Sequence, residues 1–186
     1  MSKVNQNIFL IGPMGSGKTT IGKHLAKILK LDFYDCDHEL ERLTGASVNL
    51  IFDVEGEAGF RVRESRLLKQ LSAKRGVLVS TGGGAICSEQ NRQLLRSQGF
   101  VVYLKTSIEK QLKRLSQDKT RPLLQAEDKT QRLLDLARER NPLYEATADL
   151  VFSTRSSSVY ASARALSSAI LEQVDPLKTE NPHANS

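Results

Sequence analysis

A short stretch near the start of the chain combines the side chains and the spacing needed to hold a phosphate group. It runs from Gly12 to Thr19, reads GPMGSGKT, and fits the pattern G-x-x-x-x-G-K-[ST]. Glycines let successive backbone N–H groups turn toward phosphate oxygens, and a helix that begins near Lys18 directs the positive end of its dipole toward them. Lys18 can reach the β- and γ-phosphates, and the Thr19 hydroxyl can bind Mg²⁺. The stretch therefore predicts binding of a nucleoside triphosphate as its magnesium complex.

Two aspartates, Asp35 and Asp37, end the segment DFYDCD, which we interpret as a short strand over 32–37. On an extended strand, residues i and i+2 share a face, so both carboxylates can meet one ligand. We expect Asp35 to lie beside Mg²⁺ and Asp37 to lie on the hydroxyl group that accepts phosphate. The following residues, DHELERL, are compatible with a helix, so Asp37 is also a candidate helix N-cap.

Two pairs of arginines lie in segments with helical periodicity, Arg61 and Arg63 in GFRVRES, and Arg138 and Arg140 in RERNPLY. Positions i and i+2 diverge on a helix, so at most one arginine of each pair should face a given ligand. Arginine binds carboxylates through two parallel hydrogen bonds. Two converging arginines therefore favour a small carboxylate substrate, whereas the alternative is a pair of solvated helix faces.

Two further segments have residue types suited to contact with a ligand. In TGGGA, Thr81–Ala85, three glycines follow an apolar run and allow the backbone to approach a ligand closely; the alternative is a tight turn with positive φ. The polar stretch 116–128 contains Pro122 and Arg121, and we predict that it is a mobile loop. An arginine on a closing lid can stabilise the charge on a transferring phosphoryl group.

Short apolar segments alternate with segments of helical periodicity along the whole chain. We expect strands at 7–11, 32–37, within 76–84, at 100–104 and at 149–154, and helices from 18, at 47–55, 57–73 and 88–97, from 107, at 129–144 and at 159–174. This alternation predicts an α/β fold with a central parallel sheet flanked by helices. Ligands of such sheets bind at the carboxyl ends of the strands, where the glycine stretches and the aspartates fall.

Composition limits the class of protein. The 186 residues, 39% of them hydrophobic, predict one domain over 1–174 with a disordered tail at 175–186. The net charge of +6 is spread over helical faces and aromatic residues are few, so we favour an enzyme for anionic substrates over a nucleic-acid-binding protein. Cys36 and Cys87 have no metal or redox spacing, and the first residues are not apolar enough for a signal or a membrane span. We therefore expect a cytoplasmic protein without a membrane partner.

In their order and spacing, these motifs resemble the shikimate kinase family. The motifs are GPMGSGKTTIG, FYDCD, FDVEGEAGFRVRE, STGGGA, KTRPLL and ERNPLY, and the resemblance extends over about residues 7–169. It implies a P-loop NTPase fold of the nucleoside-monophosphate-kinase type with a lid at about 116–128. It also implies a monomer that transfers the γ-phosphoryl group of ATP to the 3-hydroxyl of shikimate, with Mg²⁺, in the pathway to chorismate and the aromatic amino acids.

The resemblance also implies roles for single residues. Catalysis would involve Lys18, Asp37 and Arg121, with Asp37 acting either as a base or only to orient the hydroxyl. Thr19 and, through water, Asp35 would hold Mg²⁺. Shikimate would contact Asp37, Arg61, Gly83 and Arg140. ATP would contact Gly15, Ser16, Gly17, Lys18, Thr19, Thr20 and Arg121, and adenine would contact either Arg155 or Ser157.

Three other functions remain open on the residues. Gluconate also joins a carboxylate to hydroxyl groups, so the arginines alone fit a gluconate kinase as well. A nucleotide-binding regulatory module without catalysis would show nucleotide binding but no turnover that depends on an acceptor. A nucleic-acid-binding protein would show strong binding that weakens with salt.

Overall fold

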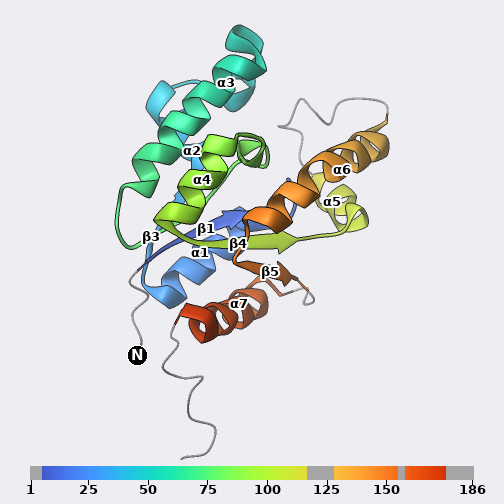
Figure 1. Cartoon of the computed structure of the whole chain (residues 1–186). Coiled ribbons are helices and arrows are strands. Elements are labelled where there is room, and N and C mark those ends of the chain that lie inside the picture. The colour runs from blue at the N-terminus through green and yellow to red at the C-terminus, as the bar shows by residue number, and fades with distance from the viewer. Residues whose placement is uncertain (1–5, 117–127, 155–157, 175–186) are drawn as a thin grey trace, which may run out of the picture.

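Five parallel strands form one sheet that has helices on both of its faces (Figure 1). This computed structural model describes residues 6–116, 128–154 and 158–174. The strands are β1 (Asn7–Ile11), β2 (Asp32–Asp35), β3 (Val77–Ser80), β4 (Gly99–Lys105) and β5 (Leu150–Ser153). The helices are α1 (Lys18–Leu29), α2 (Cys36–Thr44), α3 (Val48–Ser72), the 3₁₀-helix η1 (Ala85–Cys87), α4 (Glu89–Gln98), α5 (Ile108–Leu115), α6 (Lys129–Thr147) and α7 (Val159–Val174).

The predicted α/β class is confirmed, and β1 and α7 have the predicted bounds. Two boundaries differ from the expectation by more than one residue. The second strand ends at Asp35, two residues earlier than predicted, because the carboxylate of Asp35 accepts a hydrogen bond from the His38 N–H and so begins α2. Pro142 does not end α6, which continues to Thr147.

Alternate side chains of the central strand enter two different cores. Phe9 and Ile11 of β1 pack with α3, α4 and α6, whereas Ile8 and Leu10 pack with α1 and α7. All five residues of β1 are buried. A strand covered on both faces is largely apolar, which explains why the run from 8 to 11 does not alternate with polar residues.

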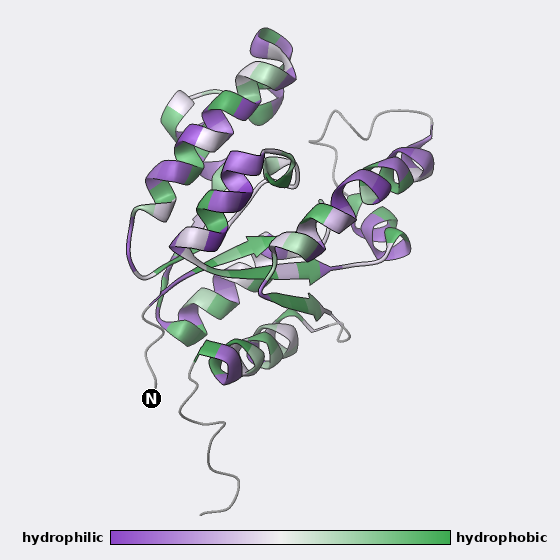
Figure 2. Cartoon of the chain, viewed as in Figure 1, coloured by the Kyte–Doolittle hydropathy of each residue, from purple (hydrophilic) through white to green (hydrophobic). Residues whose placement is uncertain are grey.

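The helices are amphipathic and cover the sheet with their apolar sides. Figure 2 shows the strands largely in green, whereas most helices carry both green and purple residues. Apolar side chains that recur every three or four residues place one stripe of a helix against the sheet. None of the helices in the described ranges is long and apolar enough to cross a lipid bilayer.

The strand order creates a topological switch point at β1. The order is β2-β3-β1-β4-β5, so β1 pairs with β3 on one side and with β4 on the other. The connection from the carboxyl end of β1 therefore runs to β2 on one side of β1, the connection from β3 runs to β4 on its other side, and the two diverge at this point. Such points are the usual ligand sites of open α/β sheets, because the loops there separate and leave a crevice.

A sharp bend divides α3 at Gly56. The φ and ψ angles of this glycine are 70° and −179°, so the helix changes direction between Glu55 and Glu57. The two halves hold each other across the bend: the rings of Phe52 and Phe60 stack with centroids 4.4 Å apart. The sequence predicts two separate helices here, ending at 55 and beginning at 57, and the bend explains that division.

Replacing Gly56 by alanine tests whether the bend depends on a glycine conformation. Gly56→Ala should lower the free energy of unfolding by about 1–3 kcal/mol, because this region of φ and ψ is nearly restricted to glycine. Gly45→Ala is the matched control: its φ of 69° and ψ of 9° are left-handed helical, and neither glycine has an atom near the position of an added Cβ. We expect a loss of about 1 kcal/mol there. A urea titration in which Gly45→Ala is the more destabilised variant would contradict the assignment.

Candidate active site

The loop after β1 curls around the ammonium group of Lys18. The Nζ atom donates hydrogen bonds to the carbonyl oxygens of Gly12 at 2.7 Å and Pro13 at 2.9 Å, and lies 3.4 Å from the Ser16 hydroxyl. The lysine residue is buried, with 8% of its surface exposed. A positive charge is thus held at the centre of the loop, at the start of α1 and beside the positive end of its dipole.

Thr19 and Asp35 meet at the edge of the same loop. The Thr19 hydroxyl, in the first turn of α1, donates a hydrogen bond of 2.5 Å to the Asp35 carboxylate at the end of β2. Both groups are open to the cleft beside them. The structure therefore places two oxygen ligands of the kind that Mg²⁺ uses next to the phosphate-binding loop.

Asp37 reaches the site in a different way from the one that the sequence suggested. The prediction of a shared strand face for Asp35 and Asp37 is wrong, because Asp37 lies in the first turn of α2. The alternative, Asp37 as the N-cap, is also wrong, since Asp35 takes that position. The Asp37 carboxylate nevertheless faces the glycine turn: a Cβ added to Gly82 would lie 3.4 Å from its Oδ1 atom.

One cleft of about 790 Å³ connects these groups. The segments that line it are the phosphate-binding loop with the start of α1, β2 with the start of α2, the end of β3 with the glycine turn, the end of α5 and the start of α7. The predicted residues that line it are Gly15, Gly17, Lys18, Thr19, Thr20, Asp35, Asp37 and Gly83. Ser16 lies in the same loop and is buried.

The first arginine pair divides as expected. Arg61 lies so close to the glycine turn that a Cβ added to Gly84 would overlap its guanidinium group. It forms a 2.7 Å ion pair with Glu64 and a 3.3 Å pair with Glu57. Arg63 points elsewhere and pairs with Glu55 on the surface. Arg61 is therefore the member of this pair that reaches the site.

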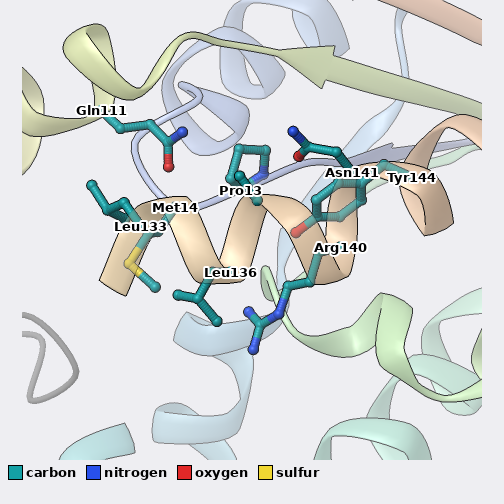
Figure 3. A pocket seen from close by; sticks show the side chains of 9 residues that line it. Pro13, Met14, Gln111, Leu133, Leu136, Arg140, Asn141 and Tyr144 are labelled. Carbon is teal, nitrogen blue, oxygen red and sulfur yellow. The ribbon is translucent and has the colours of Figure 1, made fainter. Parts of the chain in front are cut away.

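The second pair divides in the same way. Arg138 is exposed, with 76% of its side-chain surface accessible, whereas only 9% of Arg140 is accessible. Among the described residues, no hydrogen-bond partner exists for the buried Nε atom of Arg140. Figure 3 shows that its guanidinium points away from Pro13 and Met14 of the phosphate-binding loop. A buried, unsatisfied guanidinium nitrogen is costly unless a ligand supplies the missing acceptor.

Glu64 is the acidic residue between the two arginines. Its side chain is 1% exposed and passes under the glycine turn, where a Cβ on Gly82 would overlap its carboxylate. Burial raises the pKa of Glu64 above 4.5, while the charges of Arg61 and Arg140 act in the opposite direction. Arg61 thus contacts this carboxylate directly, and the charge of Arg140 acts on it as well.

A small third core connects the phosphate-binding loop to the helices on either side of residues 117–127. Met14 packs with Leu115 of α5 and Leu133 of α6. Figure 3 shows this region, a pocket of about 10 Å³ lined by Pro13, Met14 and residues of α5 and α6. Arg114 of α5 adds a 2.7 Å hydrogen bond to the Gly15 carbonyl. The position of the loop is therefore coupled to both helices.

Several predictions lie outside the described residues. These are Arg121 and most of the predicted lid at 116–128, the adenine contact at Arg155 or Ser157, and the predicted tail at 175–186. The sequence analysis also missed two residues of the site, Glu64 and Tyr144. Their signals were available, since Glu64 lies three residues after Arg61 and Tyr144 lies four residues after Arg140, on the same faces of their helices.

The parallel sheet with its strand order, the phosphate-binding loop after β1 and the adjoining cleft define a P-loop kinase of the nucleoside-monophosphate-kinase type. A sequence model described as shikimate kinase matches residues 14–174, so the chain belongs to the shikimate kinase family. A shikimate kinase of Histophilus somni (strain 2336) is 51% identical over 174 residues, which cover 93% of this chain and 97% of that protein.

Solved structures agree with this family. The structure "Shikimate kinase from Acinetobacter baumannii in complex with shikimate" has a TM-score of 0.85, 46% identity and 94% coverage of both chains. A gluconokinase from Sinorhizobium meliloti 1021 has a TM-score of 0.61 with 16% identity, covering 97% of this chain and 100% of that one. At that identity, the gluconokinase shows the shared fold alone.

The raised pKa of Glu64 predicts a specific dependence of stability on pH. Because the folded-state pKa lies above the unfolded value, the contribution of protonated Glu64 is fully present below the unfolded pKa of 4.5 and is lost as the pH rises through the folded-state pKa. Wild type should therefore gain stability relative to Glu64→Gln when unfolding is measured at about pH 5 instead of about pH 8.

The matched control for this measurement is Glu57→Gln. It removes the other acidic partner of Arg61, whose side chain is 66% exposed. Its stability difference from wild type should change little over the same interval. A difference between wild type and Glu64→Gln that shrinks toward low pH would contradict the assigned direction.

Proposed function

We propose that this chain transfers the γ-phosphoryl group of ATP to the 3-hydroxyl of shikimate, giving 3-phosphoshikimate and ADP. The observation that carries the proposal is the acceptor side of the cleft. There, Asp37 lines the cleft beside Gly82, and Arg61 lies against Gly84 of the same turn. The charge of Arg140 acts on Glu64, whose carboxylate lies against Gly82. Membership of the shikimate kinase family supports the same acceptor. The product feeds the pathway to chorismate and the aromatic amino acids.

The nucleotide side uses groups that are already in position. Lys18 donates hydrogen bonds to two carbonyls of the loop, and we propose that its ammonium, held there, also binds the β- and γ-phosphates of ATP. The remaining phosphate oxygens would be held by backbone N–H groups of Gly15, Ser16 and Gly17 and by Thr20 in the first turn of α1. Little reorganisation is needed, since the charge and the helix dipole already point into the loop.

Mg²⁺ fits the Thr19–Asp35 pair. A hydroxyl and a carboxylate in mutual contact beside a phosphate site are the sparse protein ligands that this ion takes together with phosphate oxygens and water. We propose that Thr19 binds it directly and Asp35 through water. When bound, the ion neutralises negative charge on the β- and γ-phosphates.

The acceptor side matches a molecule with one carboxylate and several hydroxyls. Arg61 and Arg140 would bind the carboxylate, and the unsatisfied Nε of Arg140 would gain its acceptor. Asp37 and the Gly83 backbone would bind hydroxyl groups. Catalysis would then depend on positioning and on stabilising the transferring charge. Asp37 can act by orienting the hydroxyl, because a loose phosphoryl-transfer state requires little activation of the nucleophile.

Three further parts of the proposal rest on the family resemblance. Arg121 would close over the phosphates from the lid, and Arg155 or Ser157 would contact adenine. The third part is the oligomeric state: we propose a monomer, because the family resemblance implies one. Cys36 and Cys87 are both free thiols, which is consistent with the cytoplasm as the proposed location.

The first experiment measures ADP release from Mg·ATP by purified protein with shikimate, with gluconate and with neither. We expect release that requires shikimate. Lys18→Met should lower kcat about 100- to 1000-fold, because the loop loses the positive charge that stabilises the transferring group. Release with gluconate instead of shikimate would move the acceptor to another hydroxy acid, and nucleotide binding without release in either case would indicate a non-catalytic module.

The second experiment compares two arginines of α6. Arg140→Ala should raise KM for shikimate about 10- to 100-fold with KM for ATP nearly unchanged, because it removes hydrogen bonds between charged groups. Arg138→Ala is the matched control, since this arginine lies on the same helix but is exposed to solvent. Equal values of KM for shikimate in the two variants would remove Arg140 from the acceptor site.

A further inference from the structure

The glycine turn on the acceptor side is fixed by hydrogen bonds to its three carbonyl groups. The Gly82 carbonyl accepts from the Ala85 N–H at 3.2 Å, and the Gly84 carbonyl accepts from the Cys87 N–H at 3.1 Å. Both of these donors lie within the same short segment. The Gly83 carbonyl accepts instead from the hydroxyl of Tyr144, at 2.5 Å and 61 residues away along the chain.

Tyr144 is held rigidly at this position. Only 1% of the surface of Tyr144 is exposed. Its ring stacks on the ring of Tyr103, with centroids 4.9 Å apart and an angle of 23° between the planes. Tyr103 in turn donates a 3.3 Å hydrogen bond to the side chain of Asn141. Figure 3 shows Tyr144 and Asn141 leaving α6 close together. The phenol that holds Gly83 therefore has little freedom to move.

Both phenols remain protonated at working pH. Burial raises the pKa of Tyr103 to about 12 and raises that of Tyr144 well above its ordinary value of 10. Tyr144 is therefore a neutral donor, and the Gly83 carbonyl is its acceptor. Arg140 lies one helical turn earlier. Its charge and a hydrogen bond from its side chain act to lower the pKa of Tyr144, so its guanidinium lies close to the same hydroxyl.

Two N–H groups of the turn are left for a ligand. Within the described ranges, the N–H groups of Gly83 and Gly84 have no hydrogen-bond partner. Because a peptide group is planar, fixing the Gly83 carbonyl also fixes the direction of the Gly84 N–H. A run of three glycines would otherwise sample many conformations, and ordering it on binding would cost affinity.

We propose that Tyr144 is a positioning residue for the acceptor: its hydroxyl fixes the Gly83 turn relative to Arg140, so that both bind the same molecule. The inference deepens the proposed function and rests on it. Tyr144 itself does not need to touch the acceptor. It sets the distance between two groups that come from different parts of the chain.

The test is Tyr144→Phe, which keeps the ring and its stack and removes only the hydroxyl. We expect KM for shikimate to rise about 3- to 10-fold, the equivalent of one hydrogen bond, with kcat and KM for ATP changed less than about 2-fold. Tyr103→Phe is the matched control, because it removes the other hydroxyl of the same stacked pair, and that hydroxyl contacts Asn141. It should leave KM for shikimate within about 2-fold of wild type.

A second variant provides a rescue. Tyr144→4-aminophenylalanine restores a donor at the same ring position and should return KM for shikimate toward the wild-type value. Equal effects of Tyr144→Phe and Tyr103→Phe, or equal losses in kcat and in both KM values, would overturn the inference and leave Tyr144 with a structural role. Wild type without shikimate-dependent turnover would instead contradict the proposed function itself, so the two failures are distinguishable.

Discussion

Parallel pairing of β1 with two neighbours is the constraint on which the site depends. Leu10 of β1 pairs with Ser80 of β3, and Ile11 pairs with Tyr103 of β4, so the three strands end at one edge of the sheet. The phosphate-binding loop and the glycine turn leave from that edge, and α2 begins there after β2. Residues more than 60 positions apart are thus brought together by backbone hydrogen bonds before any side chain of the site makes a contact.

The sequence was sufficient for those parts of the fold that are decided locally. Ser47 and Ser107 cap their helices, and such caps can be predicted because an N-cap needs only a side-chain oxygen and a following helical segment. The phosphate-binding loop was predictable for a similar reason, since its geometry is determined by the glycines and the lysine of one continuous segment. Helical periodicity predicted that only one arginine of each pair, Arg61/Arg63 and Arg138/Arg140, can face a given ligand. Periodicity alone did not say which one.

The rest depended on contacts between distant segments. Aspartate ends a strand and caps a helix equally well, so the sequence could not decide whether Asp35 or Asp37 begins α2. The hydrogen bond between Asp35 and His38 decides it in the folded chain. Glu64 and Tyr144 look like an ordinary helical acid and an ordinary core aromatic. Their importance comes from the glycine turn, which lies beside them only after the sheet has formed.

The charges of the acceptor side explain why a buried carboxylate is found where an anion is expected to bind. Glu64 holds Arg61 in place through a 2.7 Å ion pair, so the arginine loses less side-chain freedom when it binds a ligand. The cost is a buried negative charge, which is visible in the raised pKa of Glu64. The positive charge of Arg140 offsets this negative charge, and its Nε still has an unused N–H donor. Two arginines beside one buried carboxylate leave a net positive charge, which favours one further carboxylate.

A single helix relates this acceptor region to the phosphate-binding loop. Leu133, near the start of α6, packs on Met14 of the loop, and Tyr144, near its end, holds Gly83. These two residues are separated by about 16 Å of helix rise, on the basis of 1.5 Å per residue. Because a helix is stiff along its axis, α6 fixes the distance between the group that would hold the phosphate donor and the turn that would hold the acceptor. In-line phosphoryl transfer requires that distance to be controlled closely, and here one continuous element controls it.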